Sequence, residues 1–134
     1  MEKFTGSKFN KDLTPREIAS KIRAAIKAEF PLSQLVASVH NFYLNIYITV
    51  KELAINPLNP ANIDANGNQI DIMNMYSNQY LIYKERLQDI ALTYQKRESE
   101  IESDYSQANF YLHIKLDEKL YSESVNQIIA GKAA

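Results

Sequence analysis

Between residues 15 and 30, apolar side chains recur every four positions, so they would share one face of a helix. The members of this stripe are Ile18, Ile22, Ile26 and Phe30. Both ends of the segment are also marked. Thr14 and Glu17 have the spacing of a capping box around Pro15, and Pro31 disfavours helical geometry at the residue before it. The sequence therefore predicts an amphipathic helix over residues 15–30.

After Pro31 the apolar period changes to two, which is the period of a strand. In "NFYLNIYITV" (41–50), one side would carry Phe42, Leu44, Ile46, Ile48 and Val50. In "NFYLHIKL" (109–116), one side would carry Phe110, Leu112, Ile114 and Leu116. The short run "LVASVH" (35–40) comes just before the first of these, so we expect a hairpin that turns at His40 and Asn41. These apolar sides are expected to share one core with the first helix.

From residue 72 to residue 102, apolar and aromatic side chains alternate spacings of three and four, as in heptad repeats. The positions are Met73, Tyr76, Tyr80, Tyr83, Leu87, Ile90, Tyr94, Arg97 and Ile101. This pattern predicts one long helix, whose first half would pack across the sheet and whose second half would project into solvent. Residues 117–131 suit a short last helix that ends at Gly131.

The predicted fold class is α+β, with a small antiparallel three-stranded sheet covered by the N-terminal helix and the long helix. The element order is α-β-β-α-β-α. A length of 134 residues predicts a single domain over residues 1–134. We expect flexible ends at about 1–12 and 131–134. Two Asn-Pro steps and one Asn-Gly step predict a loop at about 55–70.

This loop carries part of a calcium-binding pattern, in Asp64, Asn66, Asn68 and Asp71. An EF-hand loop needs glycine at its sixth position and glutamate at its twelfth. Here Gly67 comes two places early, and Met75 stands at the twelfth position. We therefore interpret the asparagines as turn-forming residues and predict neither a metal site nor a cofactor.

The composition excludes several functional classes. There is no cysteine, so disulfides, thiolate zinc sites and cysteine nucleophiles are absent, and a reducing cytoplasmic location is expected. A net charge of −1 gives no overall attraction to DNA or anionic lipid. No apolar run reaches the roughly 20 residues that cross a membrane. No Gly-rich phosphate loop, H-E-x-x-H motif or Gly-x-Ser-x-Gly motif occurs, so we predict that the chain is not an enzyme.

Three groups of side chains are candidate binding residues. On the polar side of the predicted strands lie Tyr43, Tyr47, Tyr111, His113 and Lys115. On the projecting half of the long helix lie Tyr94, Arg97 and Ile101. A basic stripe on the first helix contains Arg16, Arg23 and Lys27. The sheet tyrosines could contact a protein partner, stack single-stranded bases or be buried in an oligomer. The basic stripe could contact phosphates or form an ordinary solvated helix face.

The N-terminal third resembles one of the large polyvalent protein-associated domains of phages and conjugative elements. The matching residues are Glu17, Ile18, Ala19, Ile22, Arg23, Lys27, Phe30, Pro31, Ser38 and Val39. The chain departs from the family after Pro31, where a glycine and a Phe-Ser-Val strand are replaced by "LSQLVASV". This resemblance implies a mobile-element origin and no known catalysis.

Two functional classes follow from these observations. In the first, the chain is a non-enzymatic protein-binding factor from a phage or mobile element, such as an anti-CRISPR-like inhibitor of a host defence complex. Its partner would then be a host protein or a second copy of the chain in a homodimer, with no membrane involved. In the alternative, it is a nucleic-acid-binding accessory protein that uses the tyrosine-bearing sheet face or the basic stripe.

Overall fold

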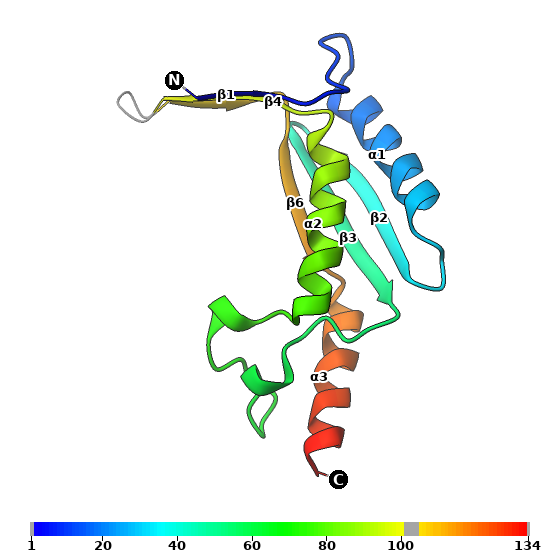
Figure 1. Ribbon diagram of the computed structural model, residues 1–134, viewed down its shortest axis with the longest axis vertical. Helices are drawn as coiled ribbons and strands as arrows, with labels where there is room; N and C mark the ends of the chain where they lie inside the picture. Colours follow the sequence, from blue (N-terminus) through cyan, green and yellow to red (C-terminus); the bar gives the residue numbers. More distant parts are fainter. Residues whose placement is uncertain (1, 101–104, 134) are drawn as a thin grey trace.

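A computed structural model describes residues 2–100 and 105–133 and shows two sheets and three α-helices within these ranges. The main sheet contains β2 (Leu35–Phe42), β3 (Asn45–Leu53) and β6 (Tyr111–Leu116), in the order β2-β3-β6. Helices α1 (Pro15–Glu29) and α2 (Asn78–Leu92) pack on one face of this sheet, and α3 (Glu118–Ala133) continues beyond its end (Figure 1). The small sheet contains β1 (Glu2–Thr5), β4 (Lys96–Glu100) and β5 (Tyr105–Ala108), in the order β1-β4-β5.

The predicted α+β class is confirmed, and the order α-β-β-α-β-α is confirmed in outline by α1, β2, β3, α2, β6 and α3. Strands β1, β4 and β5 are additional, and β1 and β4 project to one side of the main body (Figure 1). One pairing differs from the prediction. β2 and β3 are antiparallel, whereas β3 and β6 are parallel. The chain must cross over to make a parallel pair, and α2 forms part of that connection.

Helix α1 begins and ends where the sequence predicts. The Thr14 hydroxyl accepts a hydrogen bond from the Glu17 amide at 3.2 Å, and the Glu17 carboxylate accepts one from the Thr14 amide at 3.1 Å. This reciprocal pair satisfies amides that have no partner within the first turn. The predicted stripe is buried, with Ile22 fully inaccessible to solvent.

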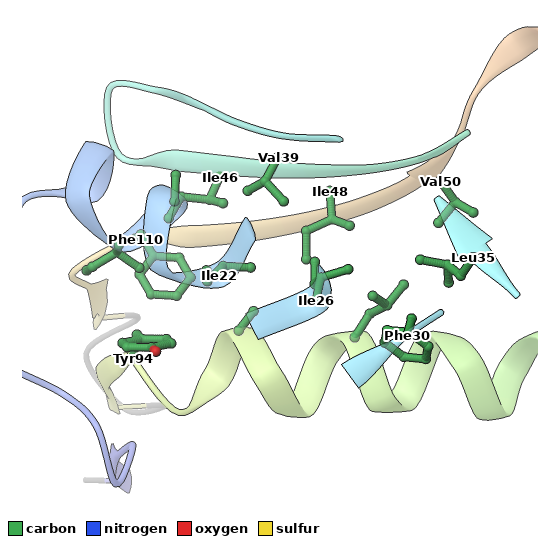
Figure 2. Close-up of a cluster of buried hydrophobic side chains, with 14 of the residues drawn as sticks. Ile22, Ile26, Phe30, Leu35, Val39, Ile46, Ile48, Val50, Tyr94 and Phe110 are labelled. Carbon is green, nitrogen blue, oxygen red and sulfur yellow. The ribbon is translucent and has the colours of Figure 1, made fainter. Parts of the chain in front are cut away.

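The core lies between the main sheet and the two helices (Figure 2). Side chains from the sheet, including Val39, Ile46, Ile48 and Val50, meet those of α1 and α2 there, together with Phe110 just before β6. Leu112 and Ile114 are partly buried against the same cluster. The prediction that Leu44 belongs to this core is wrong, because Leu44 is 50% exposed. The hairpin turns at Tyr43 and Leu44 rather than at His40 and Asn41, and this places Leu44 outside the sheet.

The predicted long helix over residues 72–102 is also corrected. A 3-10 turn spans Ile72–Asn74, α2 starts after the N-cap Ser77 and ends at Leu92, and residues 96–100 form β4. Tyr94 does not project on a helix. It follows the end of α2 and is buried in the main core.

The N-terminal segment contacts the chain where α2 ends. The Gly6 amide donates to the Gln95 carbonyl at 2.8 Å, and the Lys8 amide donates to the Thr93 carbonyl at 2.8 Å. A Cβ atom at Gly6 would lie 2.3 Å from the carbonyl oxygens of Leu92 and Thr93, so only glycine permits this approach. Residues 2–5, within the predicted flexible end, form β1 and pair with β4.

The predicted loop at 55–70 is held in place by asparagine and aspartate side chains. Asp64 Oδ1 accepts hydrogen bonds from the Asn66 and Asn68 amides, both at 2.9 Å, and Gly67 supplies a positive φ of 84°. Asn62 is buried and donates to the Asp71 carbonyl at 2.7 Å. The loop packs on α3 through a second apolar cluster that contains Leu58, Ile63 and Ile128. This is the turn chemistry expected from the asparagines.

We predict different costs for two aliphatic truncations. Ile22→Ala should lower the free energy of unfolding by about 2–5 kcal/mol, because it removes buried methyl groups and leaves a cavity. Leu44→Ala should change it by less than about 0.5 kcal/mol, because Leu44 is half exposed. Urea unfolding followed by circular dichroism measures both. Equal costs for the two variants would contradict this assignment of the core.

We also predict a loss of stability at alkaline pH. Burial raises the pKa of the Tyr80 hydroxyl well above its usual value, and the nearby Tyr76 raises it further. The unfolded chain releases this proton at about pH 10, whereas the folded chain retains it to higher pH. The contribution to stability is therefore complete below about pH 10 and falls as the pH rises above it. Denaturant unfolding at pH 7 and pH 11 should show a smaller decline for Tyr80→Phe than for the wild type, and equal declines would contradict the assignment.

Candidate interaction surface

The face of the main sheet opposite α1 and α2 carries a regular array of polar and aromatic side chains. We call this the open face. Strand register aligns its residues in three rows, which are Phe42, Asn45 and Tyr111; His40, Tyr47 and His113; and Ser38, Thr49 and Lys115. Along β6 the open-face residues are exposed, and the residues between them are partly buried against the core.

The middle row is a stack of three rings, one from each strand. The His40 and Tyr47 ring centroids are 5.0 Å apart with an interplanar angle of 13°, and those of Tyr47 and His113 are 4.7 Å apart at 17°. His113 Nε2 lies 2.9 Å from Asn45 Oδ1, which fixes its ring orientation. Lys115 Nζ lies 5.6 Å from the Tyr47 ring centroid. The row is therefore held by contacts among its own members.

This stacking determines which parts of the rings are accessible to a ligand. Sheets that bind single-stranded nucleic acid offer ring faces on which bases stack. Here both faces of Tyr47 are covered by His40 and His113. The stack therefore presents ring edges and polar atoms outward, which suits hydrogen bonding better than base stacking.

A second feature adjoins the open face where β2 turns into β3. Phe42, Tyr43 and Leu44 are 61%, 79% and 50% exposed, and Tyr111 on the neighbouring strand is 40% exposed. The Tyr111 amide donates to the Leu44 carbonyl at 2.7 Å, so these residues are adjacent. We call Phe42, Tyr43, Leu44 and Tyr111 the hairpin tip. An exposed cluster of large apolar side chains is typical of a binding surface.

The backbone of the hairpin tip is unusual. Phe42 pairs with Asn45, so Tyr43 and Leu44 form a two-residue loop, and Tyr43 has a φ of 53°. A positive φ at the first loop position matches strand twist, and glycine or asparagine usually supplies it. For a tyrosine this conformation costs about 1–2 kcal/mol. The Tyr43 ring packs edge-on against Phe42, with centroids 4.6 Å apart, but the side chain remains exposed, so burial does not offset that cost. Strained backbone of this kind concentrates at functional sites.

The structure brings together most of the predicted sheet residues. Tyr47, Tyr111, His113 and Lys115 lie on the open face, and Tyr43 lies at the adjoining tip. His40 and His113 are not direct neighbours, because β3 and the Tyr47 ring lie between them.

The second predicted group is not brought together. Tyr94 is 8% exposed in the core. Arg97 lies on β4 with its guanidinium 4.7 Å from the Phe4 ring centroid. Ile101 lies outside the described residues.

The basic stripe on α1 is divided. The Arg23 guanidinium donates to the Val39 carbonyl on β2 and is partly buried, so it holds α1 against the sheet. Arg16 and Lys27 are exposed.

Sequence reasoning missed Phe42 and Leu44 as surface residues, because their period matched the core side of the strand. The signal that could have revealed them is the run of three large residues in "NFYLN" between two strand patterns. A two-residue loop within that run leaves its central side chains outside the sheet.

Two further properties of the described residues bear on function. Within residues 2–100 and 105–133, no group of three or more histidine, aspartate or glutamate side chains is arranged to hold a metal ion. Over the same ranges, no helix has the length and apolar character needed to cross a membrane.

Comparisons with models of protein families, with curated protein sequences and with solved structures find no match for this chain.

We predict that the ring stack contributes to stability. Tyr47→Ala should lower the free energy of unfolding by about 1–3 kcal/mol, because it removes the central ring and both of its aromatic contacts. Tyr111→Ala on the same face should cost less than about 0.5 kcal/mol, because Tyr111 is exposed and outside the stack. Urea unfolding tests both, and a Tyr47→Ala protein as stable as the Tyr111→Ala protein would contradict the role of the stack.

Proposed function

We propose that this chain is a non-enzymatic protein-binding factor whose main contact surface is the hairpin tip. The observation that carries this proposal is the exposure of Phe42, Tyr43 and Leu44 on a loop whose backbone disfavours tyrosine. Folding alone would favour a small or polar residue at such a position. A partner that covers the tip gives these side chains a role that folding does not.

The composition of the surface supports a protein partner. Interfaces between proteins combine an apolar, often aromatic, centre with a polar rim. The hairpin tip supplies the first, and the neighbouring open-face residues His113 and Lys115 supply the second. Tyrosine also adds large contact area with few rotatable bonds, which is one reason that it is frequent among residues dominating binding energy.

A narrower proposal concerns the source and the target. The resemblance of the N-terminal third to a phage and conjugative-element domain supports a mobile-element origin. A small factor of that origin would act on a host protein, and we propose inhibition of a host defence complex as its role. Expression in a strain that carries a defence system should then restore plaques of the phage that the system blocks. Failure across a panel of such systems would remove this narrower proposal and leave protein binding in place.

Nucleic-acid binding remains the alternative, and two contacts disfavour it. The ring stack covers the faces of Tyr47, and Arg23 is engaged with a backbone carbonyl. A salt-sensitive shift of single-stranded DNA or RNA at near-physiological salt would favour the alternative over protein binding.

We predict that the contact surface can be removed without loss of the fold. The double variant Tyr43→Gly with Leu44→Asn installs a Gly-Asn loop, which a two-residue hairpin favours. Its free energy of unfolding should be unchanged or higher by up to about 1 kcal/mol, because the positive φ is then relaxed. Its affinity for the partner should fall at least about tenfold, as expected when contacts that dominate an interface are lost.

The measurement is quantitative pull-down from bacterial lysates, with urea unfolding as the folding control. Leu32→Asn is the matched control, because Leu32 is 74% exposed in the connection between α1 and β2. It should leave partner capture unchanged. Equal capture by the wild type and the double variant would contradict the proposed role of the hairpin tip.

A further inference from the structure

The two edges of the main sheet are treated differently. Along β2, the edge is modified by a bulge between Val36 and Ala37, by α1 packed beside it, and by Arg23, which donates to the Val39 carbonyl. Bulges and covering elements are usual means of preventing an edge strand from pairing with another chain. On the opposite edge, β6 has β3 as its neighbour on one side and no strand on the other among the described residues.

The hydrogen bonds of β6 show which backbone groups face this free edge. The Tyr111 amide donates to the Leu44 carbonyl at 2.7 Å, and the Asp117 amide donates to the Val50 carbonyl at 2.9 Å. A strand in a parallel ladder bonds to one neighbour through alternate residues. Leu112 and Ile114 alternate with the residues that bond to β3. Their amide and carbonyl groups therefore point away from β3, toward the free edge.

One outward carbonyl already has a side-chain partner. The carbonyl of Phe110, just before β6, accepts a hydrogen bond from the side-chain Nε2 of the buried Gln95 at 2.9 Å. For the outward groups of Leu112 and Ile114, no corresponding partner occurs within residues 2–100 and 105–133. The free edge thus begins at Leu112, two residues beyond the Phe110 carbonyl that Gln95 occupies, and it is available for pairing with a strand.

A groove of about 550 Å³ runs along this edge between β6 and α2. Its floor and walls include Leu92 from α2, and Leu112 and Ile114 from β6. A strand paired with β6 would direct alternate side chains into this groove. An apolar side chain near the centre of the groove would cover Leu92, Leu112 and Ile114, which are only partly buried.

The charged residues that line the groove are both basic. Lys84 comes from α2, Arg97 comes from β4, and no aspartate or glutamate is among the lining residues. Lys84 Nζ lies 5.1 Å from the Tyr76 ring centroid, and Arg97 Nη1 donates to Gln95 Oε1 at 3.4 Å, so neither side chain is neutralised by a carboxylate in these contacts. Like charges would disfavour a second copy of the chain in the same groove, whereas carboxylates of a ligand would complement both groups.

We propose that this groove binds an extended acidic segment of a partner protein, which joins the main sheet as a fourth strand beside β6. Recognition of this kind takes affinity from main-chain hydrogen bonds and specificity from alternate side chains. Lys84 and Leu92 are about 12 Å apart along the helix axis, a span that four residues of a strand also cover. The fitting segment therefore has an apolar residue beside Leu92 and an acidic residue four positions away, beside Lys84. This site adjoins the hairpin tip at Tyr111, but Tyr43 and Leu44 do not line it, and the proposal does not depend on the contact surface proposed above.

The probe is a displayed library of random heptapeptides, selected on the wild-type protein and counter-selected on Lys84→Glu with Arg97→Glu. We expect enrichment of peptides with an acidic residue four positions from an apolar one. For the enriched peptide, the double reversal should weaken binding by about tenfold or more, because charge-assisted contacts are replaced by repulsion. Lys115→Glu is the charge-reversal control on β6, because Lys115 lies on the open face and does not line the groove. It should leave peptide binding unchanged.

Hydrogen exchange separates strand addition from surface attraction. The bound peptide should slow exchange of the Leu112 and Ile114 amides of β6, which face the free edge, while leaving exchange in β2, at the opposite edge, unchanged. Peptides that bind the reversed protein equally well, or that bind without protecting these two amides, would overturn the proposal. Protection of the same amides without peptide, in a dimer seen by light scattering, would assign the edge to a second copy and also overturn it. Loss of partner capture in the hairpin-tip variant leaves these outcomes unaffected.

Discussion

The parallel pairing of β3 with β6 is the constraint on which the rest of the structure depends. A parallel pair cannot be closed by a tight turn, so the chain must leave the sheet after Leu53 and return at Tyr111. The returning path includes α2, which thereby covers the apolar face. Parallel strands also begin at the same end of a sheet. Tyr111 therefore stands beside Asn45, directly next to the turn between β2 and β3, and completes the exposed cluster there.

The same pairing leaves β6 as an edge strand and sets which side of it is available. Alternate backbone groups of β6 bond to β3. Its apolar side chains pack against the core, and its polar side chains lie on the open face. Only the outward amides and carbonyls remain. One strand thus serves three environments at once, and the two proposed contact regions meet at Tyr111, which belongs to the hairpin tip and also lines the groove.

The elements predicted best from the sequence are those whose signals are local. The capping box at Thr14 and the isoleucine stripe of α1 depend on residues within one helix, and both are confirmed. The alternation in β3 and β6 correctly separates Ile46 and Ile114 from Tyr47 and His113. This is why most of the open face could be predicted, although its ring stack depends on strand order and could not.

The elements predicted wrongly depend on contacts between distant residues. The spacing of Tyr80, Leu87 and Tyr94 suits a helix throughout, yet α2 ends at Leu92, where the backbone near Gly6 contacts the carbonyls of residues 92, 93 and 95. Nothing within residues 72–102 encodes that contact. The prediction that Leu44 is buried was wrong because a strand period cannot show where a two-residue loop interrupts it. The direction of β6 is likewise a property of the crossover rather than of its own residues.

The contact at Gly6 also has a consequence for the order of events during synthesis. The segment at residues 2–8 finds its partners only when residues 92–99 have been made, and the main sheet lacks its third strand until Leu116 has left the ribosome. Until then the isoleucine face of α1 has an incomplete surface to pack against, and exposed apolar surface of this kind is what chaperones bind. Codons that slow translation between residues 30 and 110 would therefore lengthen the time for which the nascent chain is vulnerable to aggregation and proteolysis.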